Sequence, residues 1–354
     1  MWILLIPAFV VAALAIGLLL LLSGICFFRR KRRVAGGVCM FLAWLLLVAF
    51  FAMNDYSQTV ALHPFAATPD GEKADSSVLR VLSYNVWNEG QYMGPHKTDC
   101  APELIESVMS VGADVVMLCE LHYNKNPQTI DSLRKLYPYN SLVFLDDAGS
   151  VSGQVFSRYP VSHVRQHFYN DTAEVCTSSA TWMMEIDAPQ GKFNFVSVHL
   201  KTNGIQSIRD SIKERDSLFT RTTFRKFEES TRRGYKCRAL EAAALRDSMD
   251  RMEGPVIALG DFNDLSGSRA LNLIQYGSPY WYPGVRPAGR RLADAWWNGG
   301  FGLGLTYYMH HLHLRLDHVL YSEQDFELLG VRVLSDWKYS DHYPLVADFR
   351  LEKL

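Results

Sequence analysis

Carboxylate, amide and imidazole side chains recur in six short motifs, each next to an apolar segment. The motifs are SYNVWN (residues 83–88), LCE (118–120), SVHL (197–200), GDFND (260–264), RLDH (315–318) and SDHYP (340–344). Their candidate chemical groups are the amides of Asn85 and Asn263, the carboxylates of Glu120, Asp261, Asp317 and Asp341, and the imidazoles of His199 and His342. A hard divalent cation takes oxygen ligands, a carboxylate can activate water, and a histidine can polarise a phosphate or transfer a proton. This set of side chains therefore suits the hydrolysis of a phosphoester.

The segments that must position these side chains alternate between strand and helix patterns. Residues 102–111 have a helical pattern, and the apolar strand patterns lie at 78–85, 114–120, 193–200, 256–261, 316–322 and 345–351. Apolar strands that each end in a polar residue indicate a layered α/β fold with a site along one edge of a sheet.

The six motifs, in this order, resemble those of the endonuclease/exonuclease/phosphatase superfamily. That group includes deoxyribonuclease I, abasic-site endonucleases, neutral sphingomyelinases and inositol polyphosphate 5-phosphatases. The resemblance covers residues 78–353, and GDFND and SDHYP are its most specific motifs. It implies a four-layer α/β sandwich, in which two packed β-sheets are flanked by helices.

The resemblance also implies a metal site. Glu120 would be the principal ligand, with Asn85 beside it and Asp341 supporting the metal or the leaving group. Carboxylate and amide oxygens suit Mg²⁺ or Mn²⁺. The residue before Glu120 is Cys119, where the family usually has glutamine, so local substrate contacts are expected to differ.

The catalytic groups follow from the same resemblance. Asp261 would activate the attacking water and Asn263 would hold the phosphate. His342 would contact the scissile phosphate, with its ring oriented by Asp317. His199 matches the histidine that assists the leaving group in the deoxyribonuclease and sphingomyelinase branches.

Residues 201–252 read as mainly helical and rich in charge. Between residues 201 and 238 there are 11 basic and five acidic side chains. Such a stretch is either a solvated helical face or a clamp for a polyanionic substrate, and on the second interpretation Lys201 and Arg238 are candidate substrate-binding residues. The histidines at 310, 311 and 313 fit the alternating faces of a strand or a histidine-lined loop better than a second metal site.

The first 54 residues differ in composition from the rest. They contain no acidic residue, and their only charges are five basic side chains at 29–33, between apolar runs at 2–28 and 34–53. Each run exceeds the ~20 residues that a helix needs to cross ~30 Å of hydrocarbon, and short basic loops stay in the cytoplasm. The pattern predicts a two-helix transmembrane hairpin.

The expected organisation is therefore a two-pass protein of the plasma or inner membrane. Residues 2–53 would lie in the lipid bilayer, residues 55–77 would form a tether, and residues 78–354 would form an extracytoplasmic catalytic domain. A disulfide among Cys100, Cys119, Cys176 and Cys237 would be permitted there, but their spacing identifies no pair.

The charge balance limits the substrate classes. Of the 36 basic side chains, 31 lie after residue 54 together with all 37 acidic ones, a net charge of −6, which argues against binding nucleic acid through bulk charge. Nucleic acid, a phospholipid head group and a soluble inositol or sugar phosphate all remain open, and no protein partner is implied. A non-catalytic binding protein on the same fold is the rival class, and it is disfavoured because every expected catalytic position is filled.

Overall fold

The computed structural model describes the chain in fourteen segments. They are residues 20–27, 33–54, 61–62, 73, 75–90, 101–122, 126–141, 153–167, 170–171, 176–177, 181–203, 221–278, 290–309 and 312–352. The chain divides into two compact units, one of residues 1–58 with 280–286 and the other of residues 59–279 with 287–354.

The first unit contains helix α2 (Arg33–Asn54), which covers the second expected membrane run. Among the described residues, no helix combines the length and the hydropathy needed to cross a bilayer. Residues 1–19 and 28–32, which hold most of the first expected span and most of the basic loop, lie outside the described segments. The expected transmembrane hairpin is therefore not supported by the described helices.

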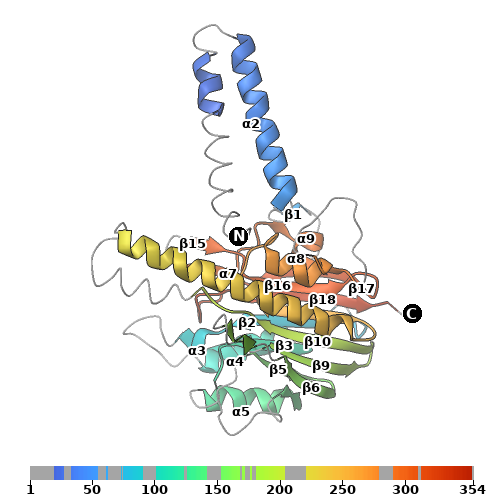
Figure 1. The fold of residues 1–354 in the computed structure, drawn as a ribbon. Helices are drawn as coiled ribbons and strands as arrows, with labels where there is room; N and C mark the ends of the chain where they lie inside the picture. The colour runs from blue at the N-terminus through green and yellow to red at the C-terminus, as the bar shows by residue number, and fades with distance from the viewer. Residues whose placement is uncertain are drawn as a thin grey trace. The chain divides into compact units, whose positions relative to one another are not determined.

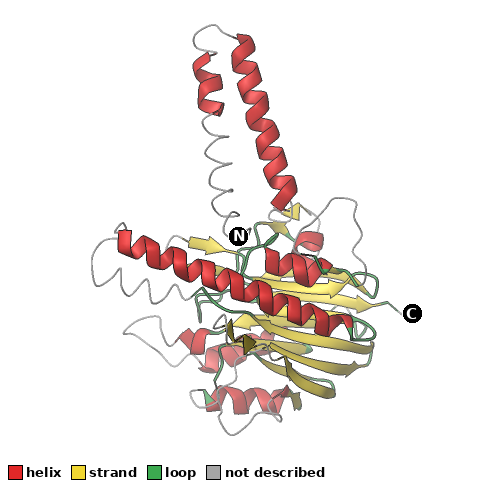
Figure 2. Ribbon diagram, in the orientation of Figure 1, coloured by secondary structure: helices red, strands yellow, loops and turns green. Residues whose placement is uncertain are grey.

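The second unit is built on two six-stranded mixed sheets (Figures 1 and 2). In spatial order the first sheet contains β17 (Phe326–Val333), β18 (Leu345–Leu351), β2 (Leu79–Asn85), β3 (Val115–Cys119), β5 (Gln154–Ser157) and β4 (Tyr139–Asn140). The second contains β12 (Leu292–Asp294), β16 (Asp317–Ser322), β11 (Val256–Asp261), β10 (Gly191–His199), β9 (Thr181–Ala188) and β6 (Val161–His167). The pairs β2–β3 and β10–β11 are parallel, and the other pairs in these sheets are antiparallel.

The two sheets share one core because successive side chains of a strand point to opposite faces. In β2, Val81 faces the core between the sheets and Leu82 faces the opposite layer. In β11, Ile257 faces the shared core and Ala258 faces outward into a second apolar cluster. Strands buried on both faces need cover on both sides, which explains their continuous apolar sequences.

Helices provide that cover. Helices α4 (Ala101–Val111) and α5 (Pro127–Leu136) pack on the first sheet, while α7 (Arg221–Asp250) and α8 (Arg269–Tyr276) pack on the second (Figure 1). Helix α8 begins after Ser268, whose side chain accepts from the backbone N–H of Leu271, and ends at Gly277 in the left-handed conformation. The expected sandwich of two packed sheets with flanking helices is confirmed.

The six strands predicted from the sequence correspond to β2, β3, β10, β11, β16 and β18. Helix α7 occupies most of the predicted helical stretch, while residues 204–220 lie outside the described segments. A disulfide joins Cys237 of α7 to Cys176 of β8 (Cys176–Thr177). Cys119 is buried and free, and Cys100 lies outside the described segments.

Two described parts of the expected tether are attached to the second unit. Strand β1 (Ala61–Leu62) pairs with β13 (Phe301–Gly302), and Ala61 is fully buried in the core between the sheets. The Nζ atom of Lys73 lies 2.7 Å from a carboxylate oxygen of Asp114. These residues belong to the folded unit and do not form a free linker.

Candidate active site

Strand pairing brings the predicted site residues to one edge of the two sheets. Strand β2 ends at Asn85, and the parallel strand β3 ends one residue before Glu120. In the second sheet, His199 at the end of β10 pairs with Asp261 at the end of β11, and Asp261 pairs with Asp317 at the start of β16. An antiparallel strand begins where its neighbour ends, so the last side chain of β11 and the first side chain of β16 lie at the same end of the sheet.

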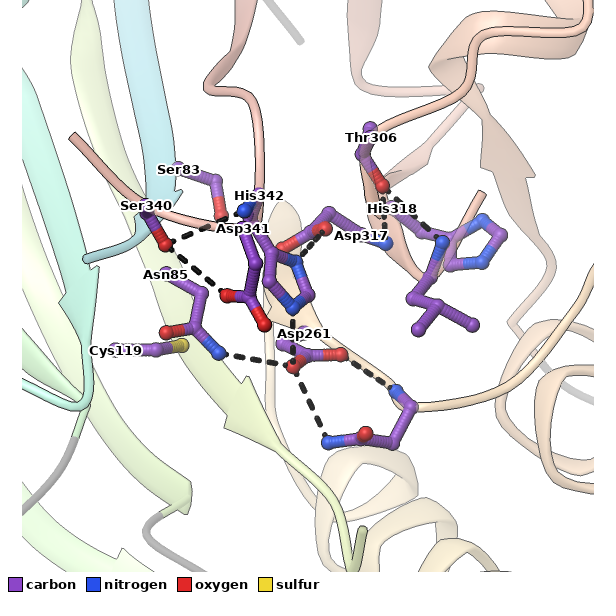
Figure 3. Close-up of polar contacts among 12 residues, drawn as sticks. Ser83, Asn85, Cys119, Asp261, Thr306, Asp317, His318, Ser340, Asp341 and His342 are labelled. Atoms are coloured by element: carbon purple, nitrogen blue, oxygen red, sulfur yellow. Dashed lines mark hydrogen bonds and ion pairs between the residues drawn. The ribbon is translucent and has the colours of Figure 1, made fainter. Parts of the chain in front are cut away.

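A buried histidine–carboxylate pair lies at the centre of this edge (Figure 3). Nδ1 of His342 is 2.7 Å from Oδ2 of Asp317, and its Nε2 is 3.8 Å from Oδ2 of Asp261. Burial alone would lower the pKa of His342, but the carboxylates of Asp317 and Asp261 raise it to about 10. The imidazole is therefore held as a cation whose Nε2–H points toward Asp261.

Asp261 is surrounded by hydrogen-bond donors. Its carboxylate accepts from the backbone N–H of Asn263 at 2.7 Å, and from the side-chain amides of Asn263 at 3.2 Å and Asn85 at 3.1 Å. Burial raises the pKa of Asp261, with His342 opposing and Asp317 reinforcing the shift. A buried carboxyl group of raised pKa is a suitable general base at neutral pH.

The glycine of the GDFND motif sets the spacing between β10 and β11. Gly260 has φ 141°, and a Cβ atom at this position would lie 2.0 Å from the carbonyl oxygen of Val198. Only glycine permits this close approach. His199 and Asp261 directly follow this contact on their two strands.

The backbone around the site also departs from ordinary geometry. Trp87, Glu89, Glu120 and Asn263 have positive φ values of 43°, 58°, 55° and 51°. Left-handed conformations are uncommon for residues with side chains, and such residues often lie at functional sites. Two of these four residues carry predicted catalytic or metal-binding groups.

The predicted metal ligands lie close together. The side-chain amide of Asn85 donates to Oε1 of Glu120 at 3.2 Å, and Nε2 of His199 is 3.6 Å from the same oxygen. Burial raises the pKa of Asp341 to about 6, with His342 opposing and the Glu120 carboxylate reinforcing the shift. A divalent cation would relieve the repulsion between these carboxylates, so their oxygen donors fit Mg²⁺ or Mn²⁺.

Asn85 fits a metal only with a rotated amide. Its oxygen accepts from the backbone N–H of Trp87 at 3.0 Å, which leaves the amide nitrogen facing Glu120. A second set of possible ligands consists of Asp261, Asp317 and His342, whose ligand-type atoms lie within 4.8 Å of one another. Oδ1 of Asp317 is buried with no hydrogen-bond partner in the described part of the chain.

The two predicted substrate-binding residues occupy different environments. Lys201 is partly exposed two residues after the end of β10, whereas the side chain of Arg238 is only 2% exposed. The Arg238 guanidinium lies 2.9 Å from Oδ2 of Asp264 and donates to the carbonyl of Lys201 at 2.9 Å and to Oδ1 of Asn203 at 2.7 Å. This arrangement favours an internal structural role for Arg238. Of the histidine run, His313 is exposed on β15 (Leu312–Leu314), and residues 310 and 311 lie outside the described segments.

A charged network beneath the site had no assigned role in the sequence. Nη1 of Arg315 lies 3.0 Å from Oδ2 of Asp294, and Nδ1 of His318 lies 3.4 Å from the same oxygen. Burial alone would raise the pKa of Asp294, but Arg315 and His318 lower it to about 2. Arg315 and His318 belong to the RLDH motif, but nothing in the sequence indicated that they contact Asp294.

Two hydroxyl groups near the histidine were also missed. The backbone N–H of His342 donates to Oγ of Ser340 at 3.2 Å (Figure 3). Thr306 is fully buried, and its Oγ1 accepts from the backbone N–H of Asp317 at 3.0 Å (Figure 3). Ser340 lies inside a recognised motif, but no pattern in the sequence distinguishes Thr306.

A comparison with protein families supplies independent information about this site. Residues 195–342 match the Endonuclease/Exonuclease/phosphatase family. The matched segment contains His199, Asp261, Asn263, Asp317 and His342. This family match supports the assignment of the chain as an enzyme that hydrolyses phosphoesters.

Solved structures of low sequence identity share the fold. An endonuclease/exonuclease/phosphatase from Bacteroides vulgatus has 15% identity and a TM-score of 0.53, over 78% of this chain and 99% of that one. The human Nocturnin catalytic domain with bound sulfate has 15% identity and a TM-score of 0.51, over 81% and 96% of the two chains. An endonuclease/exonuclease/phosphatase from Beutenbergia cavernae DSM 12333 has 19% identity and a TM-score of 0.50, over 77% and 72%. A comparison with curated protein sequences finds no match.

Proposed function

We propose that the chain is a divalent-metal-dependent phosphoester hydrolase, either a phosphodiesterase or a phosphatase, in which water attacks the phosphorus in line with the leaving oxygen. The observation that carries this proposal is the buried arrangement of Asp261, His342 and Asp317. Nε2 of His342 and Oδ2 of Asp261 lie 3.8 Å apart, which places a proton donor and a proton acceptor side by side. A phosphoryl oxygen and an attacking water require these two groups at one place.

Each side chain has one role in the proposed reaction. Asp261 accepts the proton of the attacking water, and His342 donates a hydrogen bond to a phosphoryl oxygen while Asp317 fixes its ring. The Asn263 amide holds the phosphate. As the bond from phosphorus to the leaving oxygen breaks, His199 supplies a proton to that oxygen.

The proposed metal is Mg²⁺ or Mn²⁺, held by the carboxylates of Glu120 and Asp341 and, once the Asn85 amide is rotated, by its oxygen. When bound, such a cation neutralises charge that develops on the phosphoryl oxygens. The proximity of the Glu120 and Asp341 carboxylates supports this position. In the absence of a cation, their repulsion contributes to a pKa of about 6 for Asp341.

We also propose that the catalytic domain works in an oxidising compartment outside the cytoplasm. The Cys176–Cys237 disulfide supports this location, because structural disulfides persist in such compartments and are rare in the cytosol. The apolar runs at 2–28 and 34–53 remain proposed sites of membrane attachment. Membrane fractionation combined with protease protection of intact cells would test both. A cytosolic domain protected from external protease, with both cysteines free, would contradict the location.

The enzymatic proposal is tested with the full chain purified in detergent. Wild type and Asp261→Asn are incubated with Mg²⁺ and a panel of plasmid DNA, sphingomyelin, and inositol and sugar phosphates. Hydrolysis of one substrate class by the wild type alone supports the proposal and selects a nuclease, a phospholipid hydrolase or an inositol phosphate hydrolase. Equal hydrolysis by Asp261→Asn would show that the reaction does not use this site.

A further inference from the structure

The Asp317–His342 pair depends on two separate segments of the chain. Asp317 begins β16, which is paired with β11 and β12. His342 lies in the 340–344 loop before β18, a strand of the other sheet. A hydrogen bond of 2.7 Å between their side chains therefore requires something to fix the two segments relative to each other. Thr306 contacts both.

Thr306 holds the segment of Asp317 through three hydrogen bonds. Its Oγ1 accepts from the backbone N–H of Leu316 at 3.1 Å and from that of Asp317 at 3.0 Å, and Figure 3 shows the contact with Asp317. Its own backbone N–H donates to the carbonyl of Leu314 at 2.9 Å. A hydroxyl oxygen has two lone pairs, and both are used here. A valine of similar shape would leave the two N–H groups without this acceptor.

Thr306 also holds the loop of His342. Its carbonyl accepts from the backbone N–H of Tyr343 at 2.6 Å. The next residue, Tyr307, forms a β-bridge with His342, and the two ring centroids lie 4.9 Å apart. The backbone N–H of Tyr308 then donates to the carbonyl of Asp341 at 2.8 Å. The start of β14 (Tyr307–Met309) thus lies along the histidine loop as a short antiparallel strand.

We propose that Thr306 is a positioning residue that sets the hydrogen bond between Asp317 and His342 by joining the two segments that carry them. Thr306 does not touch the reacting atoms. It is fully buried, and its N–H, carbonyl and hydroxyl are each used for this junction. Its effect on turnover rests on the proposed phosphoester hydrolase function, whereas its effect on the histidine ring does not.

The test compares Thr306→Val, which removes the hydroxyl, with Thr306→Ser, which retains it. Ser322→Ala is the matched control, because Ser322 also carries a buried hydroxyl that accepts from a backbone N–H group. Ser322 lies at the end of β16 opposite Asp317, and its Oγ accepts from the backbone N–H of Val256 at 2.9 Å. The first readout is the NMR signal of the His342 Nδ1 proton in the full chain without metal. The second is kcat on whichever phosphoester substrate the wild type hydrolyses.

We expect Thr306→Val to shift or broaden the Nδ1 proton signal of His342 and to lower kcat by about 10- to 100-fold. Thr306→Ser and Ser322→Ala should each retain the wild-type signal, with kcat within about 3-fold of wild type. A folded Thr306→Val protein with the wild-type signal would overturn the proposal, and so would a Thr306→Ser protein that loses the signal.

Hydrogen exchange in the wild type keeps the proposal testable if Thr306→Val does not fold. The amides of Leu316 and Asp317 should be protected from exchange, because both donate to the buried hydroxyl. Rapid exchange of either amide in the folded protein would refute the junction. If the wild type hydrolyses none of the substrates, the proposed function fails, while the NMR and exchange results still decide the role of Thr306.

Discussion

Replacement of Arg238 by methionine separates two roles for a residue in the basic stretch. As a substrate-binding residue, Arg238 would affect KM and leave the stability of the protein unchanged. As the internal partner of Asp264, it would affect stability first. Methionine retains much of the side-chain volume, so the change removes mainly the charge and its hydrogen bonds.

The contacts of Arg238 give the magnitude. The Arg238 and Asp264 side chains are 2% and 9% exposed, so the variant leaves a buried carboxylate without its cation. Breaking a buried pair in this way costs about 3–5 kcal/mol in the free energy of unfolding. The carbonyl of Lys201 and the amide oxygen of Asn203 lose a donor as well. For a domain of this size we expect Tm to fall by roughly 10 °C.

Thermal unfolding followed by circular dichroism measures this change, and steady-state kinetics on an identified substrate measure KM. The matched control is Arg232→Met, which removes an exposed cation from the same helix and should shift Tm by no more than about 2 °C. The reasoning is refuted if Arg238→Met retains the wild-type Tm and raises KM several-fold. That result would place the guanidinium in contact with substrate.

Four further predictions concern the site and the disulfide. Asp261→Asn should lower kcat by at least about 100-fold with little change in Tm. Excess chelator should abolish wild-type turnover until Mg²⁺ or Mn²⁺ is added. Near-full activity of the variant, or of the wild type in excess chelator, contradicts the mechanism. Asp317→Asn should lower the pKa of His342 from about 10, as measured by NMR titration without metal. The stabilisation from this raised pKa is complete below the ordinary value near 6.5 and is lost as pH rises toward 10, so unfolding of the variant should depend less on pH in that window. Replacing Cys176 and Cys237 together by serine should reduce the free energy of unfolding by about 4 kcal/mol, from the 61-residue separation, as measured by urea denaturation.

The sequence predicted which strand ends meet, because the candidate catalytic groups lie at the ends of apolar runs. Asp261 and His199 are the last residues of strands that are largely buried on both faces, and such runs are recognisable without a structure. That the strands meet at one edge follows from their pairing, which a general rule for layered α/β folds anticipates.

The contacts between distant segments could not be predicted. Thr306 is an isolated threonine in a loop. Its proposed positioning role depends on contacts with Leu316 and Tyr343, which lie 10 and 37 positions further along the chain. Arg238 looked like a substrate-binding residue because a count of charges does not reveal that Asp264, 26 positions away, is buried beside it.

The pairing of β1 with β13 has a practical consequence for where the folded unit can be cut. A recombinant fragment that starts at residue 78, the boundary suggested by the first long strand pattern, would lack Ala61, which is fully buried between the sheets. It would also expose the edge of β13, which normally pairs with Ala61–Leu62. A fragment starting near residue 59 retains both contacts, so it is the shorter form suited to crystallisation and to directed evolution of the enzyme.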